Sequence, residues 1–152
     1  MKISELCSRN VISIPASASV VEAARLMCEH SVGAVIVTAA PADRPIPVGI
    51  LTDRDIVCAQ LDRTVDLAQM RTADVMAADP LVLNEEDPVD EAIRRMRARA
   101  VRRAPVIGRS GELTGVISFD DLLAHLAASL ARLAQITDQA RRRHGVSAAS
   151  HG

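Results

Sequence analysis

Aromatic residues are almost absent from this sequence: Phe119 is the single one, and tryptophan and tyrosine do not occur. Hydrophobic residues make up 49% of the chain, and because almost none of them is aromatic, the core has to be built from aliphatic side chains. Single-stranded nucleic acids are commonly bound by stacking bases on aromatic rings, and this chain offers no such platform. The 18 basic and 19 acidic residues nearly cancel, so charge gives no reason for attraction to nucleic acid or to an anionic membrane. We therefore expect neither as a partner.

Long apolar runs are also missing. No stretch reaches the roughly 20 apolar residues that span a bilayer, and the first ten residues lack the apolar core of a secretory signal. The three cysteines have no close pair, so we expect reduced thiols in a cytoplasmic protein, with Cys7 and Cys28 at apolar positions and Cys58 similarly placed. No metal site is expected, because the four histidines lie far apart and no metal-binding spacing is present.

An internal repeat is the strongest signal in the sequence. Residues 48–57 (VGILTDRDIV) align with residues 114–123 (TGVISFDDLL) at a separation of 66 positions. Upstream the separation is 69 positions, and the aligned segments there are 3–7 with 72–76 and 21–27 with 90–96. The separation changes because the first repeat has a longer loop, residues 39–47, than the second, residues 108–111.

Both repeats predict the same order of elements, strand, helix, strand, strand, helix. Apolar residues at helical spacing predict the first helix of each repeat, with Ser19 as one N-cap and Asp87, before Pro88, as the other. The expected strands are 11–14, 34–38, 48–51, 81–83, 104–107 and 113–117, and the expected helices are 20–27, 53–61, 89–96 and 119 onward. Neither repeat has much core alone, so we expect one α/β (α+β) body with pseudo-two-fold symmetry.

The expected domain boundaries follow from this repeat. They are a first domain at 1–62, a short polar linker at 63–71, a second domain at 72–127, a helical extension at 128–144 and a disordered tail at 145–152.

The final helix carries an apolar stripe with no counterpart in the first repeat. Its members are Leu122, Leu126, Leu130, Leu133 and Ile136, and the helical pattern runs to about Arg143. Two interpretations stay open: a longer cap over the protein's own core, or the contact surface of a homodimer.

A Thr/Ser-x-x-Asp motif lies where the last expected strand of each repeat meets the last expected helix. It occurs as Thr52–Asp55 and as Ser118–Asp121. One interpretation is a capping box, which satisfies free backbone N–H groups at a helix start and stabilises by about 1 kcal/mol. The other is a phosphate site, because the same turn offers N–H groups and the positive end of a helix dipole. Spacing alone favours the capping box.

These motifs resemble the CBS-domain family, in particular small stand-alone bacterial proteins that consist of little more than one CBS pair. The resemblance covers about residues 1–127 and is carried by residues 49–56, 101–107 and 115–122. It implies two clefts between the repeats that bind adenine nucleotides, such as AMP, ADP or ATP, or relatives such as S-adenosylmethionine.

The resemblance also implies roles for individual residues. Asp55 and Asp121 would hold ribose hydroxyls, Thr52 and Ser118 would contact phosphate, and Ile50 and Val116 would flank adenine; Ile12, Val32, Gly33, Leu81, Arg102 and Arg103 would complete the clefts. One cleft would combine Ser118 and Asp121 with Ile12 and Val32. The other would combine Thr52 and Asp55 with Leu81 and residues 101–103.

Charge distinguishes the two repeats. Residues 94–103 contain six arginines and no acid, whereas residues 32–34 of the first repeat carry no charge. We expect the four arginines at 94, 95, 97 and 99 to form a solvated helix face. Arg102 and Arg103 enter a strand, and we expect the stronger anion site to combine them with Ser118 and Asp121.

The sequence favours a non-catalytic regulatory module that binds an adenine nucleotide, acts as a homodimer and reports to an unidentified effector protein. No cofactor is required, although AMP, ADP or ATP would be bound. The alternative is a structural or interaction dimer whose clefts are vestigial. An enzyme is not expected, since the sequence shows no nucleophile–base pair, metal set or Walker-type loop.

Overall fold

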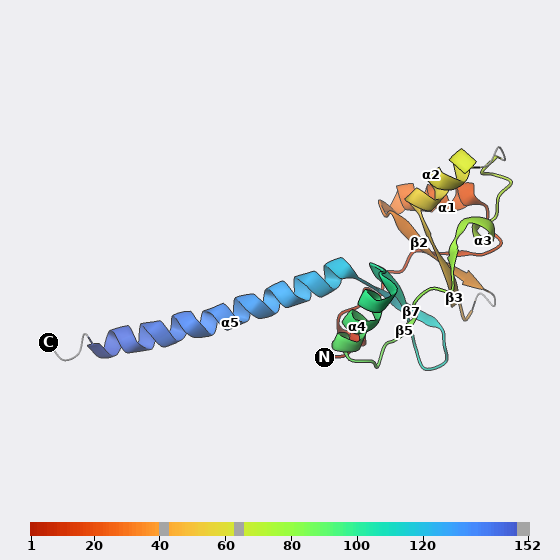
Figure 1. The fold of residues 1–152 in the computed structure, drawn as a ribbon. Coiled ribbons are helices and arrows are strands. Elements are labelled where there is room, and N and C mark those ends of the chain that lie inside the picture. Colours follow the sequence, from red (N-terminus) through yellow and green to blue (C-terminus); the bar gives the residue numbers. More distant parts are fainter. Residues whose placement is uncertain (40–42, 63–65, 149–152) are drawn as a thin grey trace. The chain divides into compact units, whose positions relative to one another are not determined.

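The structure is a computed structural model that describes residues 1–39, 43–62 and 66–148 (Figure 1). It divides into two units, Met1–Ser118 and Phe119–Gly152. The first unit contains both repeats up to the last strand, and the second contains the final helix. Parts of the expected long loop (residues 40–42) and of the expected linker (residues 63–65) lie outside the described residues.

The first repeat has the expected order of elements. It consists of β1 (Ser13–Pro15), α1 (Val20–His30), β2 (Ala34–Ala39), β3 (Ile46–Thr52) and α2 (Asp53–Asp62). β1 is parallel to β2, and β2 is antiparallel to β3. Helices α1 and α2, orange and yellow in Figure 1, lie side by side over this sheet.

The second repeat has the same order and the same pairing directions. It consists of β5 (Leu83–Asn84), α4 (Val89–Arg99), β6 (Arg103–Ile107), β7 (Leu113–Ser118) and α5 (Phe119–Ala148). The apolar pattern and the repeat therefore predicted the order of the major helices and strands, although the expected strands 11–14 and 81–83 overlap β1 and β5 only in part. Helix α5 continues to Ala148, so the first four residues of the expected disordered tail are helical, and residues 149–152 lie outside the described part. Gly145 did not end the helix because one interior glycine costs only about 1 kcal/mol.

The segment at the start of each repeat packs on the other repeat. Residues 3–5 form a 3₁₀ turn, η1 (Ile3–Glu5), and their aligned partners form a short helix, α3 (Thr72–Val75), which the sequence analysis did not predict. The Ile3 N–H donates to the Asp87 carbonyl at 2.9 Å, and the Thr72 N–H donates to the Ala18 carbonyl at 2.8 Å. The two starting segments are thus exchanged, which ties the repeats together.

The exchange continues at the sheet edges. A two-residue strand, β4 (Ala77–Ala78), pairs with β3, and Ser8 pairs with Val116 of β7 in the equivalent place. Each exchanged segment therefore adds an edge strand or bridge to the other repeat's sheet, and these pairings satisfy backbone groups that would otherwise lack partners.

This close approach explains the glycines shared by the repeats. A Cβ atom on Gly115 would lie 2.9 Å from the Ser8 carbonyl oxygen and 2.9 Å from Cys7 Sγ. On Gly49 it would lie 3.0 Å from the Ala77 carbonyl oxygen and against the Met76 side chain. Glycine is needed at both positions because a neighbouring backbone occupies the space of a side chain, and not for an unusual φ.

The core of the first repeat is aliphatic, as expected. It is formed by Ile14, Val20, Ala23, Met27, Val35, Val37, Leu51, Ile56 and Met70. Met70 lies in the stretch expected to be a polar linker, and its carbonyl accepts the Val20 N–H at 2.8 Å, so this end of the link is part of the first repeat.

The cysteine predictions are only partly confirmed. Cys7 is buried, as expected, but Cys28 and Cys58 are exposed. The buried face of α1 runs through Val20, Ala23 and Met27, and Cys28 lies one residue, or about 100°, beyond that face. In α2 the buried residue is Ile56, and Cys58 points about 200° away from it.

The predicted N-caps also have different outcomes. Ser19 caps α1, since its hydroxyl accepts the Glu22 N–H at 3.2 Å. Asp87 is not the N-cap of α4, because that position is held by Pro88. The Asp87 carboxylate instead accepts the Asn84 N–H at 3.2 Å and closes the turn before the helix.

Candidate functional site

The turn from β3 into α2 places Thr52 and Asp55 face to face. The Thr52 N–H donates to Asp55 Oδ2 at 2.9 Å, and the Asp55 N–H donates to Thr52 Oγ1 at 3.2 Å. Both side chains are half-buried. This reciprocal pair is the capping box expected from the spacing, so the motif has a structural role before any ligand is considered.

A cavity opens beside this capping box. Its volume is about 380 Å³, which lies within the range of roughly 300–1,000 Å³ typical of small-molecule sites. Its lining residues are Ala34, Ile50, Thr52, Asp55, Ala77, Val101, Arg102 and Arg103. The cavity therefore lies between the repeats, with β3, α2 and β4 on one side and the start of β6 on the other.

The chemistry of the lining is divided. Ile50, Ala77 and Val101 supply apolar wall, Thr52 and Asp55 supply a hydroxyl and a carboxylate, and Arg102 and Arg103 supply two positive charges. Guanidinium groups suit the bidentate geometry of phosphate oxygens. A molecule with an apolar ring, hydroxyl groups and a negative end matches this arrangement.

Both arginines lie at the cavity of the first repeat. The expected combination of Thr52 and Asp55 with residues 101–103 is therefore seen in one cavity. The other expected grouping, which combines Arg102 and Arg103 with Ser118 and Asp121, stays a prediction.

Leu81 does not line this cavity, contrary to expectation. It is buried and lines a separate hollow that also includes Arg95 and Arg99. Its place is taken by Ala77, which pairs with Ile50. The sequence held a signal for Ala77, since it follows the aligned segment 72–76 and a repeated segment implies a repeated contact.

Backbone hydrogen bonds hold the remaining expected site residues. The Ile12 carbonyl accepts the Ile36 N–H at 3.0 Å, the Val32 N–H donates to the Met27 carbonyl at 3.0 Å, and the Gly33 carbonyl accepts the Asp53 N–H at 3.1 Å. Val116 exchanges two backbone hydrogen bonds with Ser8, both 2.9 Å long.

The second Thr/Ser-x-x-Asp motif spans the end of one element and the start of the next. Ser118 ends β7, and Asp121 lies in the first turn of α5. The second cleft, built from Ser118 and Asp121 with Ile12, Val32, Gly33 and Val116, stays a prediction.

The other arginines of the second repeat belong mainly to a solvated helix face, as expected. Arg94, Arg97 and Arg99 are exposed, Arg94 pairs with Glu91, and Arg99 contacts Asp79 at 3.1 Å. Arg95 differs, since it is half-buried and donates to the Val82 carbonyl at 2.9 Å.

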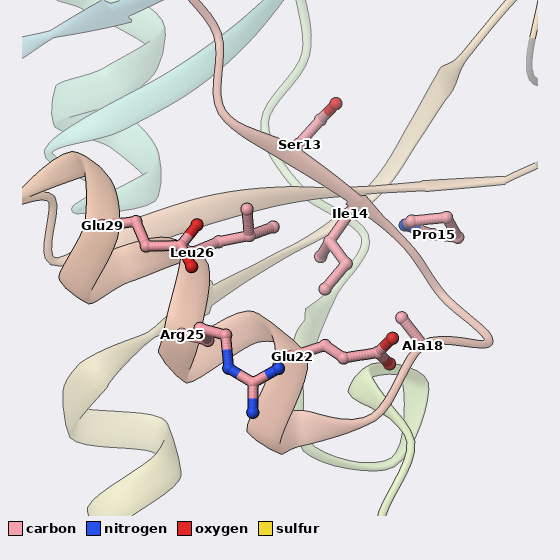
Figure 2. A pocket seen from close by; sticks show the side chains of 8 residues that line it. All are labelled: Ser13, Ile14, Pro15, Ala18, Glu22, Arg25, Leu26 and Glu29. Carbon is pink, nitrogen blue, oxygen red and sulfur yellow. The ribbon is translucent and has the colours of Figure 1, made fainter.

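A second hollow, of about 350 Å³, lies against α1 and is shown in Figure 2. Ile14 extends from β1 toward the helix, which contributes Glu22, Arg25 and Glu29. Hydrogen bonds from the Ser19 backbone and hydroxyl lower the pKa of Glu22 below its ordinary value, so it is charged at neutral pH. Two carboxylates against one guanidinium disfavour an anion here, and the cavity beside Thr52 is the better anion site.

Metal sites and membrane spans are both absent from the part of the chain that the structure describes. Within the described residues, no three His, Cys, Asp or Glu side chains gather closely enough to hold a metal ion. None of the helices in that part of the chain combines the length and the hydropathy needed to cross a membrane.

The repeat is matched by a known family. A model of the CBS domain matches residues 3–62 and again residues 73–128. The chain belongs to the CBS-domain family. This confirms both the family resemblance and the fold, a tandem CBS pair of mixed α/β structure with a long C-terminal helix.

Several curated proteins are similar in sequence. An uncharacterized protein from Methanopyrus kandleri is 28% identical over 123 residues, which cover 81% of this chain and 61% of the relative. A 17.7 kDa protein from Acidianus ambivalens is 31% identical over 80% of this chain and 70% of its own length. Inosine-5'-monophosphate dehydrogenase from Korarchaeum cryptofilum is 32% identical over 114 residues, which cover 75% of this chain and only 22% of that enzyme.

Solved structures of CBS proteins share the fold. A CBS domain protein from Pyrobaculum aerophilum, complexed with AMP, is 32% identical with a TM-score of 0.71, and the match covers 84% of this chain and 99% of that one. A hexameric CBS-CP12 protein from bloom-forming cyanobacteria is 34% identical with a TM-score of 0.67, covering 81% and 69% of the two chains. The AMP and the hexamer are properties of those proteins.

Proposed function

We propose that this CBS pair is a regulatory, non-catalytic module that binds an adenine nucleotide in the cavity beside Thr52 and Asp55. One observation carries the proposal: a single cavity combines apolar walls, a hydroxyl and carboxylate pair, and two arginines. The AMP complex of the Pyrobaculum relative supports this choice of ligand class.

The proposed roles follow the chemistry of the lining. Ile50 and Val101 flank the adenine ring, and Asp55 accepts hydrogen bonds from ribose hydroxyls. Arg102 and Arg103 hold the phosphate, with the Thr52 hydroxyl as a further donor. The capping box permits this, because a carboxylate has about four acceptor sites and a hydroxyl keeps its donor while it accepts from the Asp55 N–H.

A second function, a structural or interaction dimer with vestigial clefts, is favoured by the same capping box. Thr52 and Asp55 satisfy each other's backbone groups without a ligand. The motif therefore has a reason to be present even if nothing binds, and ligand binding separates the two functions.

We also propose that the module acts as a homodimer and reports its bound nucleotide to an effector protein. The hexamer formed by the CBS-CP12 relative supports the proposal that this chain also self-associates. This part of the proposal does not depend on which nucleotide is bound.

The test measures the melting temperature with AMP, ADP, ATP, NAD and S-adenosylmethionine. A ligand at about 100 times its dissociation constant should stabilise the fold by roughly 2.7 kcal/mol. We expect at least one adenine nucleotide to raise the melting temperature of the natural protein and to have little effect on Asp55→Ala.

The matched control for that variant is Glu22→Ala, which removes the equivalent carboxylate of the Ser19 capping box on α1. It should lower the melting temperature without ligand, as Asp55→Ala does, but keep the ligand-induced rise. No rise with any of the five compounds would reject the nucleotide proposal in favour of the structural one.

A further inference from the structure

Helix α5 presents an exposed apolar stripe. Leu122, expected as its first member, is buried, and Leu123 takes that place. The members and the exposed fractions of their surfaces are Leu123 at 53%, Leu126 at 48%, Leu130 at 68%, Leu133 at 61% and Ile136 at 63%. Single exposed leucines are ordinary, but four leucines and an isoleucine exposed along one helix are not. A stripe of this kind needs a partner surface of its own length.

The spacing of the leucines indicates another helix as that surface. Leu123, Leu126, Leu130 and Leu133 follow steps of three, four and three residues, which is the a and d pattern of a coiled coil. Three of the positions beside this seam are small, namely Ala127, Ser129 and Ala134. Small flanking side chains let two helices approach closely.

Charge along α5 indicates the direction of the pairing. Asp120 and Asp121 lie in the first turn, whereas residues 141–143 are three exposed arginines near the other end. This distribution also suits the dipole of a lone helix. Two parallel helices would place like charges side by side, whereas two antiparallel helices place each acidic end beside a basic end and oppose their dipoles.

We propose that α5 pairs antiparallel with α5 of a second molecule. The a and d pattern then sets Leu130 opposite the second molecule's Leu133, and Asp120 at a flanking position opposite its Arg141. The inference gives a surface and a direction to the homodimer proposed above, on which it rests. It does not depend on nucleotide binding.

The direction is tested with charge exchange in the full chain. Arg141→Glu and Asp120→Lys each place like charges at both ends of the antiparallel pair, so each should weaken the dimer roughly three- to tenfold in sedimentation equilibrium. The double variant restores both opposite pairs and should return the dissociation constant to near that of the natural protein. Two weakened single variants without rescue in the double variant would overturn antiparallel pairing.

The surface is tested with Leu130→Gln, for which Ala128→Gln on the outer face of α5 is the matched control. We expect the dimer to weaken roughly a hundredfold in the first and to be unchanged in the second, since two buried leucines are lost per dimer. A monomeric natural protein, or a dimer that Leu130→Gln leaves intact, would overturn the proposal. A nucleotide-induced rise in melting temperature should survive in Leu130→Gln. Failure of the helix-pairing proposal can therefore be distinguished from failure of the nucleotide proposal.

Discussion

Equivalent residues of the two repeats share backbone geometry even where their side chains differ. The C-cap of α1 is Ser31, with φ 53° and ψ 43°, and the C-cap of α4 is Ala100, with φ 51° and ψ 39°. This left-handed conformation costs a residue with a side chain about 1–2 kcal/mol, and glycine is the usual solution at a helix end. Both repeats tolerate this cost, because the chain has to reverse sharply between the helix and the next strand.

Replacing Ala100 by glycine should therefore stabilise the protein. We expect the free energy of unfolding to rise by about 0.5–1 kcal/mol, since the relief of left-handed strain exceeds the added entropy of the unfolded chain. Urea denaturation measures this change. Ala98→Gly, two residues earlier and inside α4, should lower the same free energy by about 1 kcal/mol. Changes of the same sign in both variants would contradict the explanation.

At the site, the sequence predicted the residues whose roles are local. The Thr52–Asp55 capping box depends only on a spacing of three residues, so its hydrogen bonds were predictable. For Arg102 and Arg103 the sequence supported two groupings, one of them with Thr52 and Asp55, because pattern alone does not determine which repeat residues 101–103 face. Ala77 was missed for the same reason: it reaches the cavity through an edge strand formed by a segment distant in sequence.

At the level of elements, the exchanged segments are the feature that makes the two repeats one body. Alignment at a constant separation predicted that residues 3–7 and 72–76 are equivalent. It did not predict that each packs on the other repeat, since hydrophobic periodicity reports which face of an element is buried and not against what. Gly49 and Gly115 are the residues in the sequence that reflect this exchange, because the exchanged segments approach them closely.

Gly115→Ala tests the exchange directly. The new Cβ would collide with the Ser8 carbonyl and with Cys7 Sγ, and overpacking of this kind typically costs about 1–3 kcal/mol. We expect a loss of that size in urea denaturation. Adding Cys7→Ala should recover only part of it, because the carbonyl remains.

The comparison variant is Gly33→Ala, where the nearest atom to a new Cβ is the side-chain oxygen Asp53 Oδ2 at 3.2 Å. A side chain can move aside, so the loss should be smaller than for Gly115→Ala. Equal losses would show that close backbone approach is not what requires glycine at position 115.

At the scale of the whole molecule, symmetry explains the fold and asymmetry explains the proposed ligand preference. The repeats share sheet pairing, left-handed C-caps after α1 and α4, and exchanged segments. They differ in charge: residues 101–103 bring two arginines to the cavity of the first repeat, whereas the corresponding residues 32–34 are uncharged. We therefore propose one anion site, in which the second repeat supplies the arginines and the first repeat supplies Thr52 and Asp55.

The central claim is that Arg102 and Arg103 bind the phosphate of a nucleotide held beside Asp55. Titration calorimetry with AMP and with adenosine separates the phosphate from the rest of the ligand. Hydrogen bonds to charged groups contribute about 1.5–3 kcal/mol each, so Arg102→Gln with Arg103→Gln should weaken AMP binding at least roughly tenfold and leave adenosine binding unchanged. Arg94→Gln with Arg97→Gln, the same change on the solvated face of α4, should alter neither. Unchanged AMP affinity in the first double variant, or an equal loss for adenosine, would contradict the claim.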